Sequence, residues 1–416
     1  MKKIFSAITL FCCLALTASA QQLRVYQGTV TYVYPASLLE TMTYTDGGQT
    51  LTILGRSFAT AEIDSIKVTN VPSTFTPNSI NVDYAGNRAN VTVSGDIAAL
   101  VTVSVDGANV SVLADAALQE EVTYYLSGTS TNGSFFMDGE FKSTVVLNNL
   151  NLTSATGAAI DIENGKRIAV ELPEGTASTL ADAAGGTHKA CFFINGHAEF
   201  SNAGTLNLRG NTKHAYASDE YTQFKSDFGT FNVTSALSDG MHVEQYLQVD
   251  GGTFNITGVQ GDCVDVSVTK DALDEYNGQA FINAGTFVLS VAADDTKGIK
   301  SDSDMAITGG NITATVSGNG AKGISAGSNL LVDESSGNAT NIKMSVTGTT
   351  YMPGDATLES KCRGIKVKGD MTFAGGFLDI SATGVKSKAI SIDGVFYYSG
   401  GQMTCSIDAA GGTVQI

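Results

Sequence analysis

The residues with the clearest chemical potential are bases that recur at one place in a repeated phrase. Four successive repeats carry Lys297, Lys322, Arg363 and Lys388 there, and Lys300 and Lys366 follow two of them by three residues. Cations aligned at strand spacing repel one another, so either acids or an anionic ligand must compensate them. Acids close in sequence are Asp294, Asp295, Asp302, Asp304 and Glu359. The other candidate is a uronic-acid chain laid across the row.

Two earlier repeats carry an acid at the same place. These are Asp239 and Asp262, with His242 and Asp265 beside them. Stacked carboxylates raise one another's pKa unless a cation lies between them, and calcium prefers oxygen ligands. We therefore predict a calcium site at Asp239, Asp262 and Asp265, the alternative being a solvated turn.

Other chemistry has little support in the sequence. The histidines, His188, His197, His214 and His242, lack the spacing of a zinc site, and no nucleophile or phosphate-binding motif occurs. A lyase needs a base and a cation that neutralises the sugar carboxylate, and Lys300 or Lys366 near Asp265 could serve. Tryptophan is absent, so aromatic sugar recognition would depend on Tyr246, Tyr276 or Tyr351.

The element that must position these residues is an internal repeat beginning near residue 121. Each unit contains a small–apolar pair, such as Gly298-Ile299, and four of the eight intervals between pairs are 25 residues. A second phrase, Gly229-Thr230-Phe231-Asn232-Val233, recurs in step with the first. Short alternating strands with glycine turns and no helical period are typical of a parallel β-helix. A β-sandwich array and a propeller fit this period less well.

The repeat also predicts which side chains face inward. The apolar member of each pair should fill the interior, so Ile299, Ile324, Ile365 and Ile390 should stack in one buried column. The small member should allow close packing of the backbone. Insertions at about 267–280 and 349–361 interrupt the period, and loops of this kind often carry binding residues.

The remaining chain divides into three segments. Residues 1–20 have a basic start, an apolar run and Ala18-Ser19-Ala20, which together predict a signal peptide. Residues 21–72 read as a small β-rich module, and 73–120 as short strands or a cap. The fold prediction is therefore all-β: a right-handed parallel β-helix over 121–416, preceded by a small β-rich N-terminal module.

Composition narrows the class of partner and the compartment. The formal charge of −17 argues against nucleic acid. Beyond the signal peptide we find no apolar span, so we expect no transmembrane segment. Four cysteines follow the signal peptide without a paired motif, and we expect them to be small core residues. They are Cys191, Cys263, Cys362 and Cys405.

Several phrases resemble a known bacterial family of β-helix domains named simply for carbohydrate binding. They are Gly251-Gly252-Thr253-Phe254-Asn255-Ile256, Asp239-Gly240-Met241-His242 and Lys297-Gly298-Ile299-Lys300. The resemblance covers roughly 121–416. It implies a β-helix similar in shape to calcium-dependent pectate lyases, and studied clostridial members bind cellulose and polygalacturonate. The later repeats depart from the family by carrying a base where it has an acid, so its calcium ligands do not transfer to them.

We therefore expect an exported bacterial β-helix that binds polysaccharide, acidic and of the polygalacturonate type, without catalysis. The location would be periplasmic, at the cell surface or extracellular. The alternatives are a lyase acting on acidic sugars and a structural surface or adhesion protein. Which sugar binds, and the oligomeric state, stay open.

Overall fold

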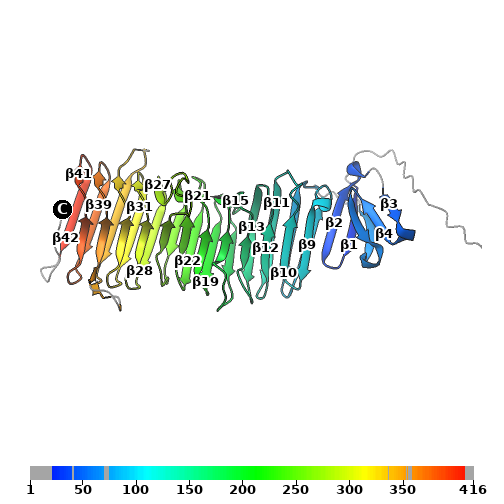
Figure 1. The fold of residues 1–416 in the computed structure, drawn as a ribbon, viewed down its shortest axis with the longest axis horizontal. Helices are drawn as coiled ribbons and strands as arrows, with labels where there is room; N and C mark the ends of the chain where they lie inside the picture. Colours follow the sequence, from blue (N-terminus) through cyan, green and yellow to red (C-terminus); the bar gives the residue numbers. More distant parts are fainter. Residues whose placement is uncertain are drawn as a thin grey trace, which may run out of the picture.

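The computed structural model describes residues 21–39, 42–69, 75–335, 337–352, 354 and 358–407. The molecule is an elongated stack of coils, with the N-terminal module at one end and β42 at the other (Figure 1). The signal peptide predicted at 1–20 lies outside the described residues. In the described part of the chain, no helix is long and apolar enough to cross a bilayer.

The coils build three faces of parallel strands. The first face consists of β12 (Ser134–Asp138), β14 (Ile160–Ile162), β17 (Ala190–Ile194), β20 (His214–Ser218), β23 (Met241–Glu244), β26 (Val264–Ser267), β29 (Lys297–Ser301), β32 (Lys322–Ala326), β37 (Arg363–Val367) and β40 (Lys388–Ile392). Each strand pairs in parallel with the next, as in the pairing of β29 with β32.

The second and third faces follow the same rule. The second face consists of β15 (Arg167–Glu171), β18 (His197–Ser201), β21 (Thr222–Phe224), β24 (Tyr246–Val249), β27 (Gln279–Ile282), β30 (Met305–Ile307), β33 (Leu330–Val332), β38 (Met371–Phe373) and β41 (Phe396–Tyr398). The third face consists of β16 (Ala177–Ala181), β19 (Thr205–Gly210), β22 (Thr230–Ala236), β25 (Thr253–Ile256), β28 (Thr286–Val291), β31 (Gly310–Val316), β34 (Thr340–Val346), β39 (Phe377–Ala382) and β42 (Gln402–Ile407). In the second insertion, β35 (Thr350–Tyr351) and β36 (Ser360–Lys361) pair antiparallel.

The N-terminal segments join this stack. β11 (Val122–Ser130) pairs in parallel with β13 (Ser143–Thr153) on one side and with β7 (Ser79–Ala85) on the other. β7 forms a hairpin with β8 (Arg88–Ser94), and β9 (Val101–Asp106) forms another with β10 (Asn109–Ala114), which pairs in parallel with β12. Parallel stacking therefore already begins within the segment 73–120.

The leading module consists of two small antiparallel sheets. β1 (Gln22–Gln27) pairs with β2 (Val30–Pro35) and β6 (Ser65–Thr69), while β3 (Met42–Thr45), β4 (Thr50–Ile53) and β5 (Arg56–Ala59) form the second sheet. β2 also pairs in parallel with β8. The helical segments described are 3-10 turns: η1 (Ala36–Leu38), η2 (Asp46–Gly48), η3 (Thr60–Glu62) and η4 (Ala98–Leu100). The fold prediction, a parallel β-helix after an N-terminal β module, is confirmed.

The interior follows the repeat. Ile299, Ile324, Ile365 and Ile390 are in register and buried, as predicted. One apolar core runs without a break from Leu23 in β1 to Ile390 in β40. The predicted close packing at the small position is also present, because a Cβ at Gly323 would lie 2.7 Å from the carbonyl oxygen of Gly364 in the next coil.

One register assignment was wrong. The sequence pattern pairs Ala190 with Cys191, which places Phe192 outside. In the structure Ala190 aligns with His214, and Phe192 aligns with Tyr216 inside the coil. All five residues of β17 are buried, so this strand has no alternation of polar and apolar side chains from which the register could be read. The predicted core role of the cysteines holds for Cys191, Cys263 and Cys362, which are unpaired and buried, while Cys405 is half-buried.

Candidate functional site

The first predicted column, the basic ladder of Lys297, Lys322, Arg363 and Lys388, exists on the first face. The four residues are direct partners in the parallel pairings of β29, β32, β37 and β40. These strands lie in the part of the stack nearer the C-terminus (Figure 1). Adjacent strands are about 4.8 Å apart, so the ladder presents one base per coil.

The N-terminal half of the ladder is compensated by the protein itself. Lys297 donates to the carbonyl oxygen of Asp295 at 2.7 Å, and its Nζ lies 3.9 Å from Asp262 Oδ1. Lys322 Nζ lies 2.7 Å from both Asp295 Oδ1 and Ser360 Oγ, and the residue is only 8% exposed. A sugar chain laid across the row would need all four bases to be exposed, and this is wrong for Lys322, because Asp295 from the preceding turn and Ser360 of β36 cover it.

Arg363 and Lys388 form the C-terminal half of the ladder, in different surroundings from the first two bases. Arg363 donates through Nη1 to the carbonyl oxygen of Lys361, and its buried Nε has no acceptor. Within the described residues, no carboxylate lies within 4.0 Å of its guanidinium nitrogens. Burial lowers the pKa of Lys388, and the neighbouring charges of Arg363, Lys361 and Lys366 lower it further. Positive charge therefore gathers around Lys388, whereas Asp393 lies near enough to Arg363 to favour its charged form.

The second predicted column carries paired bases. Lys300 donates to Asp265 Oδ1 at 2.7 Å and lies 3.0 Å from Asp302 Oδ1. Burial opposes the charged form, but the hydrogen bonds and charges of these two carboxylates raise the pKa of Lys300. Lys366 pairs with Asp393. Both bases are in the predicted column, and both are held by acids.

The predicted calcium ligands lie on adjacent coils, but they do not converge. Asp239 Oδ1 accepts the backbone N–H of Asp262 at 2.7 Å, and Asp262 Oδ1 accepts that of Lys297 at 2.8 Å. Each carboxylate thus holds the turn of the next coil. Burial raises the pKa of Asp262 to about 6, although Lys297 opposes this.

Two histidine side chains, His214 and His242, contact carboxylates of the predicted calcium site. His242 Nδ1 lies 2.9 Å from Asp265 Oδ2 and 3.5 Å from Asp239 Oδ2. Burial disfavours its charge, but hydrogen bonds to Asp239 and Asp265 raise the pKa of His242 to about 9. His214 Nδ1 lies 3.0 Å from the same Asp239 oxygen, and its ring stacks on that of His242 with centroids 4.6 Å apart.

These four residues, His214, Asp239, His242 and Asp265, form what we call the imidazole–carboxylate cluster. Calcium coordinates oxygen, whereas two of the four side chains offer nitrogen. The donor set therefore does not suit calcium well, and a calcium ion at Asp239, Asp262 and Asp265 stays a prediction. His214 was not among the predicted ligands, although its place one coil before Asp239 in the same column could have indicated it.

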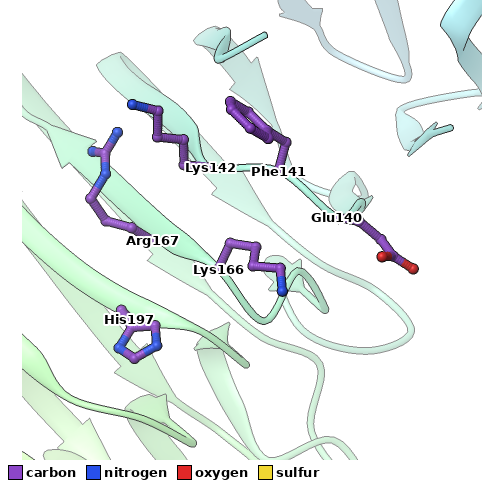
Figure 2. Close-up of a pocket in the computed structure, with 6 residues that line it drawn as sticks. All are labelled: Glu140, Phe141, Lys142, Lys166, Arg167 and His197. Carbon is purple, nitrogen blue, oxygen red and sulfur yellow. The ribbon is translucent and has the colours of Figure 1, made fainter. Parts of the chain in front are cut away.

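The structure also contains a hollow lined by basic side chains that was not predicted from the sequence. It has a volume of about 510 Å³ and lies at the start of the second face, where Lys142, Lys166, Arg167 and His197 surround it (Figure 2). Phe141 and Glu140 complete the lining, with Glu140 pointing away from the four bases. Lys142 and Arg167 both pair with Glu121, and Lys166 is exposed with no ion pair among the described residues.

An aromatic row continues from this hollow along the second face. His197 packs on Tyr221 with ring centroids 4.4 Å apart, and Tyr221 stacks on Tyr246 at 4.8 Å. Tyr276 from the first insertion meets Tyr246 edge-on at 5.6 Å. Of the predicted sugar-stacking tyrosines, Tyr246 and Tyr276 lie in this row, whereas Tyr351 lies in the separate hairpin strand β35. Tyr221 and Tyr246 stack nearly parallel, so each covers one flat face of the other's ring.

The fold and these outward columns define a solenoid whose flat parallel faces present repeated polar side chains. Residues 106–353 match the family described as carbohydrate-binding domain-containing protein, and the chain belongs to that family. Among solved structures, it is similar to the polysaccharide lyase-like protein from C. thermocellum, solved as a gadolinium derivative. The two share 20% identity with a TM-score of 0.47, over 58% of this chain and 93% of that one. No curated protein matches the chain.

Proposed function

We propose that this protein binds an acidic polysaccharide of the polygalacturonate type, without cleaving it, along the C-terminal half of the basic ladder. Membership of a carbohydrate-binding family supports polysaccharide as the ligand class. The observation that carries the acidic preference is the alignment of Arg363 with Lys388 in adjacent strands, with no carboxylate within 4.0 Å of the Arg363 guanidinium among the described residues. Arg363, Lys361 and Lys366 lie close enough to Lys388 for their charges to lower its pKa, while Asp393 acts on Arg363 in the opposite sense. A planar guanidinium in this position suits a carboxylate.

The geometry of the stack also suits a chain ligand. One base per coil, at about 4.8 Å along the axis, is similar to the length of one sugar residue. A uronate chain parallel to the axis would therefore place successive carboxylates near Arg363 and Lys388. Each exposed ion pair contributes at most about 1 kcal/mol. Affinity would depend on several such contacts together and would fall as salt is added.

Binding is favoured over lyase chemistry by the state of the candidate bases. A general base must lose its proton near the operating pH and must reach the substrate. Asp265 and Asp302 raise the pKa of Lys300, and Lys366 is paired with Asp393. Lys322 is almost sealed from solvent. Lys300 and Lys366 are therefore better suited to holding charge than to abstracting a proton, and Lys322 cannot readily reach a substrate.

The test is polygalacturonate binding by the mature protein and the double variant Arg363→Ala/Lys388→Ala, with salt varied. We expect the double variant to bind more weakly by up to about thirtyfold, the loss of two ion pairs of at most about 1 kcal/mol each, and to depend less on salt. Lys166→Ala, a single exposed cation in the basic hollow, is the matched control and should bind normally.

Three results would contradict the proposal. Unchanged binding by the double variant would remove the ladder as the site, and weak binding by Lys166→Ala alone would move the site to the hollow. Ultraviolet absorbance from unsaturated uronate products would establish lyase activity in place of simple binding. Equal affinity for an uncharged polysaccharide such as cellulose would exclude the acidic preference.

We also propose that the protein is exported, since residues 1–20 have the pattern of a signal peptide. A soluble chain with an acidic balance and a polysaccharide ligand is consistent with a place outside the cytoplasm. Cleavage of the signal peptide after Ala20 can be tested by mass spectrometry of the exported protein.

A further inference from the structure

The imidazole–carboxylate cluster has the composition of a transition-metal site. Its members come from three successive coils: His214 from β20, Asp239 and His242 from the turn and strand of β23, and Asp265 from β26. Ligand atoms of His214, Asp239 and His242 all lie within 4.8 Å of one another. His214 and Asp239 are buried, and 22% of the His242 side chain is exposed, so the cluster is enclosed but within reach of solvent.

The distances within the cluster match the edges of a coordination sphere. Zinc bonds to histidine and carboxylate of about 2.0–2.2 Å give tetrahedral ligand–ligand edges of roughly 3.3 Å. Asp239 Oδ2 lies 3.0 Å from His214 Nδ1 and 3.5 Å from His242 Nδ1. Asp265 Oδ2 lies 2.9 Å from His242 Nδ1. These three contacts have nearly the length of ligand edges. To complete the set, Asp265 would have to turn from His242 toward the other ligands. His214 Nδ1 would also have to release the backbone N–H of Asp239, which lies 3.3 Å away.

The surroundings turn one oxygen of each carboxylate toward the imidazoles. Asp239 uses Oδ1 to accept the backbone N–H of Asp262 at 2.7 Å, which leaves Oδ2 facing the imidazoles. Asp265 uses Oδ1 to accept from Lys300 at 2.7 Å, and its Oδ2 also faces His242. Outer contacts that orient ligands in this way are a regular feature of protein metal sites.

We propose that His214, Asp239, His242 and Asp265 bind one divalent transition-metal ion, for which zinc is the probe. Two neutral imidazoles and two carboxylates neutralise a divalent cation, and nitrogen with carboxylate oxygen suits zinc-class metals better than calcium. The ion would fasten three coils of the first face together, N-terminal to the basic ladder. This inference is independent of the polysaccharide site.

The experiment is zinc titration of the full-length mature protein by calorimetry, after removal of metal with a chelator, with calcium titrated in parallel. We expect one equivalent of zinc, a higher melting temperature with zinc, and no comparable effect of calcium. One equivalent of calcium with no zinc binding would overturn the assignment and restore an all-oxygen site. Failure of zinc to bind would also overturn it.

Variants locate the ion. His214→Gln and His242→Gln retain a polar side chain, and each should weaken zinc binding by more than the roughly 10–100-fold that loss of an outer contact costs. His197→Gln, on the second face, is the matched control and should bind zinc normally. Unchanged zinc affinity in both cluster variants would refute the proposal, provided that circular dichroism shows them folded.

Cobalt supplies a measurement that needs no variant. Co²⁺ bound to the unaltered protein by two imidazoles and two carboxylates in a tetrahedral set should give intense visible absorption bands. Zinc should abolish these bands by displacement. A weak spectrum of the hydrated-ion type after one equivalent of cobalt would overturn the four-ligand site even if both histidine variants failed to fold.

Discussion

Truncation of Ile324 tests the stacked interior most directly. Ile324 is fully buried between Ile299 and Ile365 in the column of the first face. Ile324→Ala removes three carbons, which costs roughly 2.4 kcal/mol of transfer free energy at about 0.8 kcal/mol per group. Adjacent coils are locked by backbone pairing and cannot fully close the gap, so a cavity cost raises the expected loss to about 3–4 kcal/mol.

The assay is guanidinium denaturation followed by far-ultraviolet circular dichroism. Val288→Ala is the matched control, because Val288 is 44% exposed on β28 and should change the free energy of unfolding by less than about 0.5 kcal/mol. Each coil contacts mainly its neighbours, so the coils around β32 should unfold at lower denaturant than the rest. A loss below about 1 kcal/mol for Ile324→Ala, or equal losses for both variants, would refute the stacked column.

Three further predictions concern charge, close packing and export. The pKa of His242 is raised from 6.5 to about 9, so its ion pairs stabilise the metal-free fold fully below pH 6.5 and are lost as pH rises through 9. The denaturation midpoint should therefore fall between pH 6.5 and pH 9, and His242→Gln should remove the part of this fall that comes from His242. Gly323→Val places a Cβ 2.5 Å from Met344 Sδ and should lower the free energy of unfolding by roughly 1–3 kcal/mol. Gly157→Ala should be tolerated, because a Cβ at Gly157 would have no neighbouring atom within 4 Å. Equal losses of stability in the two variants would contradict the close packing at Gly323. Mass spectrometry of protein secreted by a bacterial host should find a chain beginning at Gln21, and an intact Met1 in exported protein would contradict the signal peptide.

The buried Ile324 and the closely packed Gly323 both follow from the regular period of the coils. The interior column and the small position are consequences of the coil period, because parallel pairing turns a fixed spacing along the chain into a column across strands. For this reason the sequence was sufficient to predict the buried isoleucines and the order of the basic ladder. Where the spacing was irregular and all of β17 was buried, the same reasoning misplaced Phe192 by one position.

The chemistry of the outward columns was less accessible from the sequence. The column order showed that four bases align, but not which of them an acid neutralises. Lys322 meets Asp295 from 27 residues earlier and Ser360 from 38 residues later, and Arg363 meets no such partner among the described residues. Such pairings depend on turn geometry and on the path of an inserted hairpin, neither of which repeats with the coil.

The imidazole–carboxylate cluster shows most clearly what the sequence determined and what only the tertiary structure determined. The sequence by itself determined the repeat, the fold and the columns in which His214, Asp239 and Asp265 stand. It led to a calcium prediction at Asp239, Asp262 and Asp265 but to no zinc-type site at the histidines, because the familiar zinc patterns place ligands a few residues apart on one segment. Here the coil brings together residues 23 to 28 positions apart, and their side chains meet only because adjacent strands lie about 4.8 Å apart. That approach was decided by the tertiary structure alone.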